Sequence, residues 1–172
     1  KLLRPQMTLC CARLAGATNW HAVTEAAAVA EMIHIATLLH DDVLDNADLR
    51  RGLPTVKQQW GNEVAILSGD YLLAQASRKL AQIGNIRLVA IFSDVLAALC
   101  DGEVAQQCNR FDLGLTWEAY IQKCRQKTAC LFSAACESAG VVAQLPEPQI
   151  QQLVRFGDAF GLAFQLVDDL LD

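Results

Sequence analysis

The sequence predicts an all-α protein. Apolar residues make up 53% of the 172 residues and recur at helical spacing along nearly the whole chain, and no segment shows the period-two pattern of a strand. Glycine and proline are scarce, at 10 and 4 residues, so few helix breakers interrupt this pattern. The high apolar content and the 19% of charged residues are typical of one globular domain with a sizeable core.

The first half of the chain predicts four helices. Pro5 can occupy the first turn of a helix that runs to about residue 15, and Asn19 is a candidate N-cap for a long helix over about 20–45. Gly52 and Pro54 indicate a loop. The next helix, over about 63–83, ends at Gly84, and a further helix follows over about 87–108.

The second half of the chain predicts three further helices. Thr116 is a candidate N-cap for a helix over about 117–138, with a break near Gln126. Pro146 can begin the next helix, and a last one covers about 155–172.

Charge, apolar runs and cysteine content argue against several classes of protein. The net charge is -5 and no run of Lys or Arg stands out, so we expect no nucleic acid partner. Arg87, Asp94 and Glu137 interrupt the apolar segments 86–100 and 128–143, so we expect no transmembrane segment of roughly 18 uninterrupted apolar residues. The seven cysteines form no CxxC pair and we expect no signal peptide, which favours reduced thiols in a cytoplasmic protein.

Two DDxxD clusters stand out, each within an apolar run. One comprises Asp41, Asp42 and Asp45, and the other comprises Asp168, Asp169 and Asp172. Carboxylates one helical turn apart repel each other, and a hard divalent ion is their natural neutraliser. A single cluster of this kind is usually a solvated helix face. Two clusters on antiparallel helices, facing each other, would line a cavity for Mg²⁺ and a diphosphate substrate.

Basic residues fit such a substrate. Arg50 and Arg51 follow the first cluster and suit polydentate phosphate binding, although alone they would be a surface pair. Lys1 and Arg4 lie at a helix start, where backbone N–H groups also favour an anion. Lys127-Thr128 interrupts an apolar run and requires a partner. His34 is not singled out by its spacing, because a lone histidine on an apolar face is usually a core residue.

Taken together, these motifs resemble the trans-isoprenyl diphosphate synthases, the polyprenyl synthetase family, and in particular its long-chain members such as octaprenyl and solanesyl diphosphate synthases. The similarity covers the whole chain in the family's order. The motifs that carry it are Lys1-Leu2-Leu3-Arg4-Pro5, His34, both DDxxD clusters, Arg50-Arg51-Gly52, Gly69-Asp70, Gly102-Glu103-Val104-Ala105-Gln106, Lys127-Thr128 and Phe164-Gln165.

The resemblance implies a terpenoid-synthase-like antiparallel helical bundle around a central cavity, and a homodimer. It also implies that residues 1–172 form a single, partial polyprenyl synthetase domain, truncated at both ends and lacking N-terminal and C-terminal helices. The reaction it implies is the Mg²⁺-dependent condensation of isopentenyl diphosphate with an allylic diphosphate, which yields a medium- or long-chain all-trans polyprenyl diphosphate for isoprenoid or quinone biosynthesis.

The resemblance also assigns roles to residues. Three Mg²⁺ ions would bridge the allylic diphosphate to Asp41, Asp45 and Asp168, with Asp42, Asp169 and Asp172 in support. Arg50 and Lys127 would hold the allylic diphosphate, and Thr128 and Gln165 would line the reacting centre. Isopentenyl diphosphate would be held by Lys1, Arg4, His34 and Arg51.

Product length is predicted from Ala36 and Thr37, which occupy the helix turn before Asp41. In the family that the chain resembles, a bulky aromatic residue there closes the cavity and gives short products. Both residues are small here, so we expect an open tunnel, and Gln106 agrees with a longer product. The alternative is that Ala36 is small because helices pack closely at that point.

Three other functions compete. A non-catalytic subunit of a heteromeric prenyl synthase would usually lose aspartates from one cluster, and a class I terpene cyclase would lack Lys1, Arg4 and Arg51. A ferritin-like di-iron protein is suggested by Glu31 and His34, which fit one Glu-x-x-His motif, but the sequence has no second copy.

Overall fold

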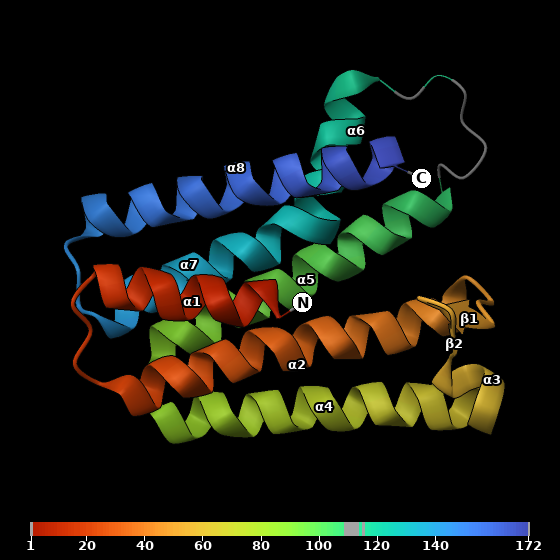
Figure 1. Cartoon of the computed structure of the whole chain (residues 1–172), viewed down its shortest axis with the longest axis horizontal. Helices are drawn as coiled ribbons and strands as arrows, with labels where there is room; N and C mark the ends of the chain where they lie inside the picture. Colours follow the sequence, from red (N-terminus) through yellow and green to blue (C-terminus); the bar gives the residue numbers. More distant parts are fainter. Residues whose placement is uncertain (1, 109–113, 115, 172) are drawn as a thin grey trace.

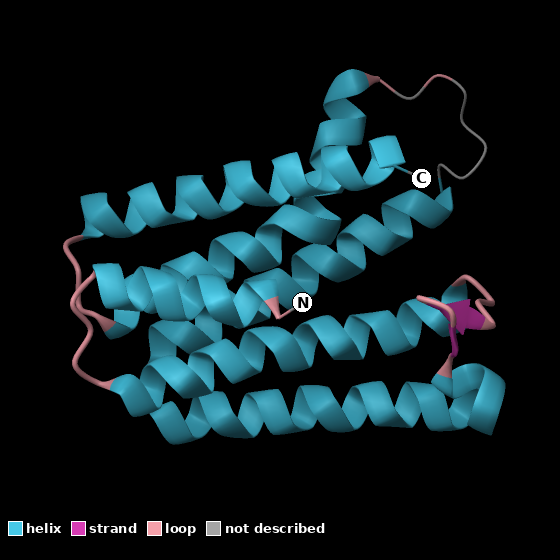
Figure 2. Ribbon diagram, in the orientation of Figure 1, coloured by secondary structure: helices cyan, strands magenta, loops and turns pink. Residues whose placement is uncertain are grey.

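The computed structural model describes residues 2–108, 114 and 116–171, and almost all of them are helical (Figures 1 and 2). The first half contains α1 (Leu3–Leu14), α2 (Trp20–Leu44), β1 (Leu49–Arg50), β2 (Leu53–Pro54), α3 (Val56–Trp60) and α4 (Asn62–Ile83). The second half contains α5 (Ile86–Cys108), α6 (Trp117–Cys124), the π-helix η1 (Arg125–Ala129), α7 (Cys130–Val142) and α8 (Glu147–Leu171).

The long helices form a bundle in which successive helices reverse direction (Figure 1). α2 packs against α1, α4 and α7, and α7 in turn packs against α1, α5 and α8. The main core cluster joins α2, α4, α5 and α7 around Ile33, Leu88, Phe92 and Leu131. Burial of these aliphatic and aromatic side chains is the main stabilising contribution to the bundle.

Local signals predicted the helix ends correctly. The Asn19 side chain accepts a hydrogen bond from the Ala22 amide (3.1 Å), and the Thr116 hydroxyl accepts one from the Ala119 amide (3.2 Å). Gly84 ends α4 with a positive φ of 71°, as expected of a glycine C-cap. The break expected near Gln126 is the π-helix η1, between α6 and α7.

Two expectations about the elements were wrong. The segment after Pro146 is the single helix α8 and not two helices, because no Gly or Pro lies between Pro148, in its first turn, and Arg155, where the second helix was expected to begin. The loop at Gly52 contains a two-stranded antiparallel hairpin, and α3 follows it. Strands of two residues are too short to show a period-two pattern.

The two aspartate clusters lie at the same end of the bundle. We expected their helices to be antiparallel, but α2 and α8 run in the same direction, with the C-terminal end of each at that end (Figure 1). α7 contacts both helices and lies between them in the packing. Because each cluster is at the C-terminal end of its helix, the parallel arrangement is the one that places both clusters together.

Among the described helices, α2 is long and apolar enough to cross a membrane by length and composition alone. An 18-residue window of α2 has a mean hydropathy of 1.5. This window was not expected from the sequence, because the expectation considered only uninterrupted apolar runs. In the structure 44% of that window is buried, and α2 packs mainly against α1, α4 and α7. The central helix of a globular bundle has the same composition, so this feature is weak evidence for a membrane span.

Candidate active site

The first aspartate cluster ends α2 and combines a paired with an unpaired carboxylate. Asp42 is only 4% exposed, and its Oδ1 accepts a hydrogen bond from Arg50 Nε at 2.7 Å. Burial raises the pKa of Asp41, against the opposing effect of Lys127, and the nearby carboxylates of Glu103 and Asp45 raise it further. Burial thus outweighs the effect of Lys127 and disfavours the ionised form of Asp41, which a bound cation would offset.

Lys127 faces this cluster from the π-helix η1. Its Nζ lies 2.7 Å from Glu103 Oε2 and donates a hydrogen bond to Gln106 Oε1 at 3.0 Å. Burial alone would raise the pKa of Glu103, but hydrogen bonds from Lys127 and Gln107 lower it overall. Gly102 allows this approach, because a Cβ there would lie 2.9 Å from Gln126 Cβ. Lys127 is therefore held in place on the acidic side of the site.

The second cluster is joined to η1 by a hydrogen-bond chain. The Thr128 hydroxyl donates to Gln165 Oε1 at 2.5 Å, and Gln165 Nε2 donates to Asp169 Oδ1 at 2.7 Å. The Tyr120 hydroxyl donates to the other oxygen of Asp169, and this hydrogen bond raises the pKa of Tyr120. Among the described residues, Asp168 has no hydrogen-bond or ion-pair partner and is free to bind a ligand.

A basic region lies beside the acidic one. Arg4 on α1 is partly buried, its buried Nε has no hydrogen-bond partner among the described residues, and burial lowers its pKa to about 10 against the opposing charge of Glu31. Burial, followed by the charges of Arg4, Arg51 and Arg50, lowers the pKa of His34 to about 3. Three arginines near one histidine concentrate positive charge, which suits a diphosphate.

The predicted site residues that the structure describes thus fall into two adjoining groups. The acidic group contains Asp41, Asp42, Asp45, Lys127, Thr128, Gln165, Asp168 and Asp169, and the basic group contains Arg4, His34, Arg50 and Arg51. Arg50 belongs electrostatically to both, because its charge affects Asp41 as well as His34. Lys1 and Asp172 lie outside the described residues.

The acidic group fits a hard ion that keeps part of its own hydration. No set of three or more Asp, Glu, His or Cys side chains is preassembled around one point in the described part of the chain. Mg²⁺ takes one or two carboxylates and completes its shell with waters and substrate phosphates, so it requires no such set. Asp168, which has no hydrogen-bond partner among the described residues, and Asp41, whose ionised form burial disfavours, suit this mode of binding.

Comparison with known proteins agrees with this geometry. The family model described as Polyprenyl synthetase matches residues 1–172, which is the whole chain. The chain belongs to the polyprenyl synthetase family. The all-α terpenoid-synthase fold expected from the resemblance is confirmed, because the similar solved structures are isoprenoid synthases.

Three members of the polyprenyl synthetase family illustrate the similarity. The nonaprenyl diphosphate synthase of Mycobacterium tuberculosis is 42% identical over 172 residues, which is 100% of this chain and 51% of the relative. A decaprenyl diphosphate synthase structure from Rhodobacter capsulatus has a TM-score of 0.97 and 45% identity, and the match covers 99% of this chain and 52% of that one. A polyprenyl synthase from Caulobacter crescentus CB15, complexed with calcium and isoprenyl diphosphate, has a TM-score of 0.95 and 40% identity, covering 98% and 51%. The chain therefore spans about half the length of these relatives.

Sequence reasoning about this polyprenyl synthetase domain missed two contacts of the site. Tyr120 was not singled out, because its link to Asp169 joins α6 to α8 and leaves no trace in local spacing. The Arg4 guanidinium lies over the Phe132 ring, 4.4 Å from its centroid. This contact also joins distant segments, α1 and α7. A buried basic residue beside an aromatic one has no one-dimensional signal.

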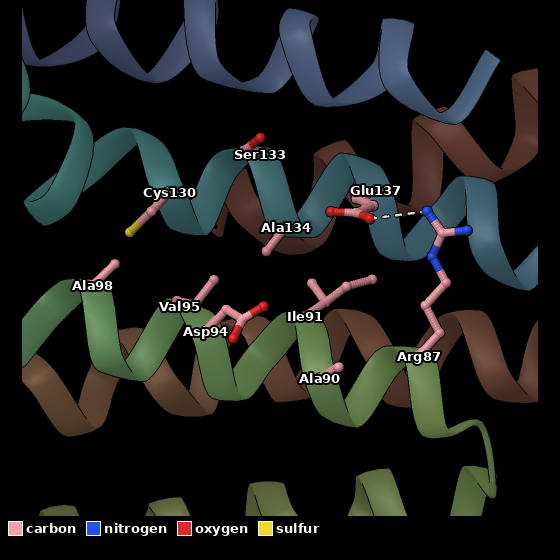
Figure 3. Close-up of a pocket in the computed structure, with 10 residues that line it drawn as sticks. All are labelled: Arg87, Ala90, Ile91, Asp94, Val95, Ala98, Cys130, Ser133, Ala134 and Glu137. Atoms are coloured by element: carbon pink, nitrogen blue, oxygen red, sulfur yellow. Dashed lines mark hydrogen bonds and ion pairs between the residues drawn. The ribbon is translucent and has the colours of Figure 1, made fainter. Parts of the chain in front are cut away.

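A groove of about 480 Å³ between α5 and α7 is separate from the predicted site (Figure 3). It is lined by Arg87, Ala90, Ile91, Asp94, Val95, Ala98, Cys130, Ser133, Ala134 and Glu137. None of these is a predicted site residue. Figure 3 shows Arg87 from α5 pointing toward Glu137 on α7, and these side chains are 3.2 Å apart.

Proposed function

We propose that this chain is the catalytic part of a Mg²⁺-dependent trans-polyprenyl diphosphate synthase. It would condense isopentenyl diphosphate with an allylic diphosphate and release a medium- or long-chain all-trans polyprenyl diphosphate for isoprenoid or quinone biosynthesis. The observation that carries the proposal is the adjacency of the two groups around Arg50. In the acidic group, burial disfavours the ionised form of Asp41 although Lys127 and Arg50 lie nearby, and in the basic group three arginines surround His34 while Arg4 Nε is buried without a hydrogen-bond partner among the described residues.

Each group suits one of the two diphosphates. The allylic diphosphate would bind at the acidic group, through Mg²⁺ held by Asp41, Asp45 and Asp168. Isopentenyl diphosphate would bind at the basic group, where Arg4 and Arg51 supply charge and the neutral His34 donates a hydrogen bond. Arg50, between the groups, would place one cation close to both substrates.

The chemistry follows from the charges of the site. When bound, Mg²⁺ supplies the positive charge that stabilises pyrophosphate as it departs from the allylic carbon. Lys127, held by Glu103 and Gln106, adds a fixed cation on the same side. The allylic cation is then attacked by the isopentenyl double bond, and a proton is lost to the released pyrophosphate. The Thr128–Gln165 pair would contact the reacting carbons.

The open-tunnel hypothesis is supported by a cavity below the site. About 130 Å³ of space lies between α2, α4 and α5, lined mainly by Ile33, Leu73, Ala76, Leu80, Phe92 and Leu96. Ile33 is one helical turn from Thr37, which is one turn from Asp41. An apolar chain that starts at Asp41 and passes Thr37 would reach this apolar space, which supports a path for the product along this side of α2.

The proposal extends to assembly and location. We expect a homodimer, because α4 exposes a cluster of large apolar side chains, namely Val64, Ile66, Leu67 and Tyr71. We expect a cytoplasmic protein, because all seven cysteines are free. Both are proposals from the surface and thiols of this chain.

The direct test uses the full-length protein with Mg²⁺, farnesyl diphosphate and isopentenyl diphosphate, and reads products by mass spectrometry. A ladder of all-trans products ending at about seven to ten isoprene units supports the reaction and the tunnel. Products that stop at geranylgeranyl length keep the reaction and reject the tunnel. Complete absence of condensation, in a folded protein that still binds pyrophosphate with Mg²⁺, favours a non-catalytic subunit.

A further inference from the structure

Asp169 is held on both sides of its carboxylate. Oδ2 accepts a hydrogen bond from the Tyr120 hydroxyl, and Oδ1 accepts one from Gln165 Nε2 at 2.7 Å. Two donors in different directions fix the rotation of a carboxylate, and hydrogen bonds to an ionised acceptor are strong. The neighbouring Asp168 has no such partner in the described part of the chain. Hydrogen bonds therefore fix the carboxylate of Asp169 but not that of Asp168.

Tyr120 reaches Asp169 from another helix. α6 begins at the Thr116 cap and packs against α5, η1 and α8, and the Trp117 ring lies 5.4 Å from the Tyr120 ring, centroid to centroid. Gln165 is itself fixed by the Thr128 hydroxyl at 2.5 Å. We call these hydrogen bonds of Tyr120 and Gln165 to Asp169 the clamp. Through Tyr120 and Thr128, the clamp connects α6 and η1 to one side of α8.

Helix geometry relates the clamp to the site. Successive residues are rotated by about 100° on a helix, so Asp168, about two turns after Gly161, lies on nearly the same face of α8 as Gly161, while Asp169 is turned toward α6. Gly161 packs against Ala129 of η1, next to Thr128. Asp168 is therefore an exposed carboxylate on the face of α8 that packs against η1, which carries Lys127 and Thr128 of the acidic group.

We propose that Tyr120 is a positioning residue of the active site: by clamping Asp169 together with Gln165, its hydroxyl leaves Asp168 as the metal-binding carboxylate of the second cluster. This inference rests on the proposed function. Tyr120 touches neither substrate nor metal, and it acts through Asp169.

The test is Tyr120→Phe in the full-length protein, which removes only the hydroxyl. The binding of inorganic pyrophosphate is measured by isothermal titration calorimetry over a range of Mg²⁺ concentrations, together with the thermal midpoint. We expect the Mg²⁺-dependent Kd to rise about tenfold and the thermal midpoint to change little. Thr24→Val is the control for loss of a hydroxyl, because Thr24 is exposed near the other end of α2 and should leave the Kd within about twofold of the original value.

A double substitution tests whether Tyr120 affects the binding of pyrophosphate through Asp169. In an Asp169→Asn background, Tyr120→Phe should raise the Kd no further, because the carboxylate that it orients is gone. A lower thermal midpoint with an unchanged Kd would show that Tyr120 only stabilises the fold, and would overturn the proposal. If Tyr120→Phe does not fold, unchanged binding in Asp169→Asn alone also overturns it.

The outcomes separate this inference from the proposed function. If the unsubstituted protein binds pyrophosphate with Mg²⁺ and makes polyprenyl products while Tyr120→Phe binds equally well, only the positioning role fails. If the unsubstituted protein shows no Mg²⁺-dependent binding of pyrophosphate, the metal site fails and this inference fails with it.

Discussion

The Arg4 guanidinium lies over the ring of Phe132, 4.4 Å from the ring centroid, and its Nε has no hydrogen-bond partner in the described part of the chain. The ring supports the cation on one face through a cation–π interaction. Because the ring cannot accept the N–H hydrogen bonds in the guanidinium plane, that plane is available to an anion. Under the proposed function, Phe132 would orient Arg4 toward the diphosphate.

Replacing Arg4 by Met tests this arrangement. Methionine keeps much of the volume and the contact with the ring but removes the charge. We expect the free energy of unfolding to stay the same or rise, because a desolvated cation is removed, and we expect the KM for isopentenyl diphosphate to rise about tenfold to a hundredfold. The control is Arg13→Met on the exposed side of the same helix. An unchanged KM would place isopentenyl diphosphate elsewhere.

His34 predicts a pH dependence of stability. Unfolded histidine binds a proton below about pH 6.5, whereas His34 in the folded protein has a pKa of about 3. Between these values the unfolded state binds more protons, so stability falls as the pH drops from 6.5 toward 3, by at most about 1.4 kcal/mol per pH unit.

The measurement is urea unfolding at pH 7 and pH 5. His34→Gln should show a smaller loss of stability at pH 5 than the unsubstituted protein, because the site no longer titrates. His21→Gln is the control, since His21 is exposed on the same helix. Equal pH dependence in all three proteins would contradict the burial of a neutral His34 among arginines.

Asp41→Asn should abolish synthesis without loss of stability. The folded-state pKa of Asp41 is raised, so its ionised form is disfavoured in the folded protein above the ordinary carboxyl pKa of about 3.9, and an amide removes that unfavourable charge. We expect an equal or higher thermal midpoint without Mg²⁺, and at least about a hundredfold loss of turnover because a metal ligand is missing. Asp101→Asn, on the exposed face of α5, should change neither quantity. Retained turnover in Asp41→Asn would refute the metal assignment.

The sequence predicted the parts of this protein that depend on local signals. Asn19, Thr116 and Gly84 marked helix ends through side-chain capping or backbone freedom, and the aspartate clusters were visible as repeated carboxylates in apolar helices. The parallel direction of α2 and α8 depends on the number of helices between them, and local spacing does not report it. The Tyr120–Asp169 and Arg4–Phe132 contacts were missed for a similar reason, since each joins residues from separate helices.

Gly161 shows why a residue of low helix propensity lies within α8. Glycine disfavours a helix interior, but a Cβ at this position would lie 2.5 Å from Ala129 Cα, so the approach of α8 to η1 requires glycine. Gly161→Ala should therefore push α8 away from η1 and lower the free energy of unfolding by about 1–3 kcal/mol. It should also lengthen the Thr128–Gln165 hydrogen bond and reduce turnover. Ala159→Ser, exposed on the same helix, is the control. Full stability of Gly161→Ala would show that this approach is not tight.

The last prediction concerns product length and separates the two small residues before Asp41. Thr37 lies one turn before Asp41 on nearly the same face of α2, whereas Ala36 is rotated by about 140° from Asp41 and is fully buried. Thr37→Phe should therefore place a ring in the path of the growing chain and shorten the product with a modest loss of stability. Ala36→Phe should shorten it as well, but with a larger loss because its site has no free volume.

Product spectra by mass spectrometry and thermal midpoints of both variants distinguish the tunnel from simple helix packing. Ile35→Phe is the control, because Ile35 is 41% exposed on the same turn and should leave the product length unchanged. If Ala36→Phe is destabilised and Thr37→Phe makes the original product, the small residues serve only the packing of α2, and the end of the tunnel lies further along the helix. If Thr37→Phe shortens the product while Ile35→Phe does not, the growing chain passes the Asp41 face of α2.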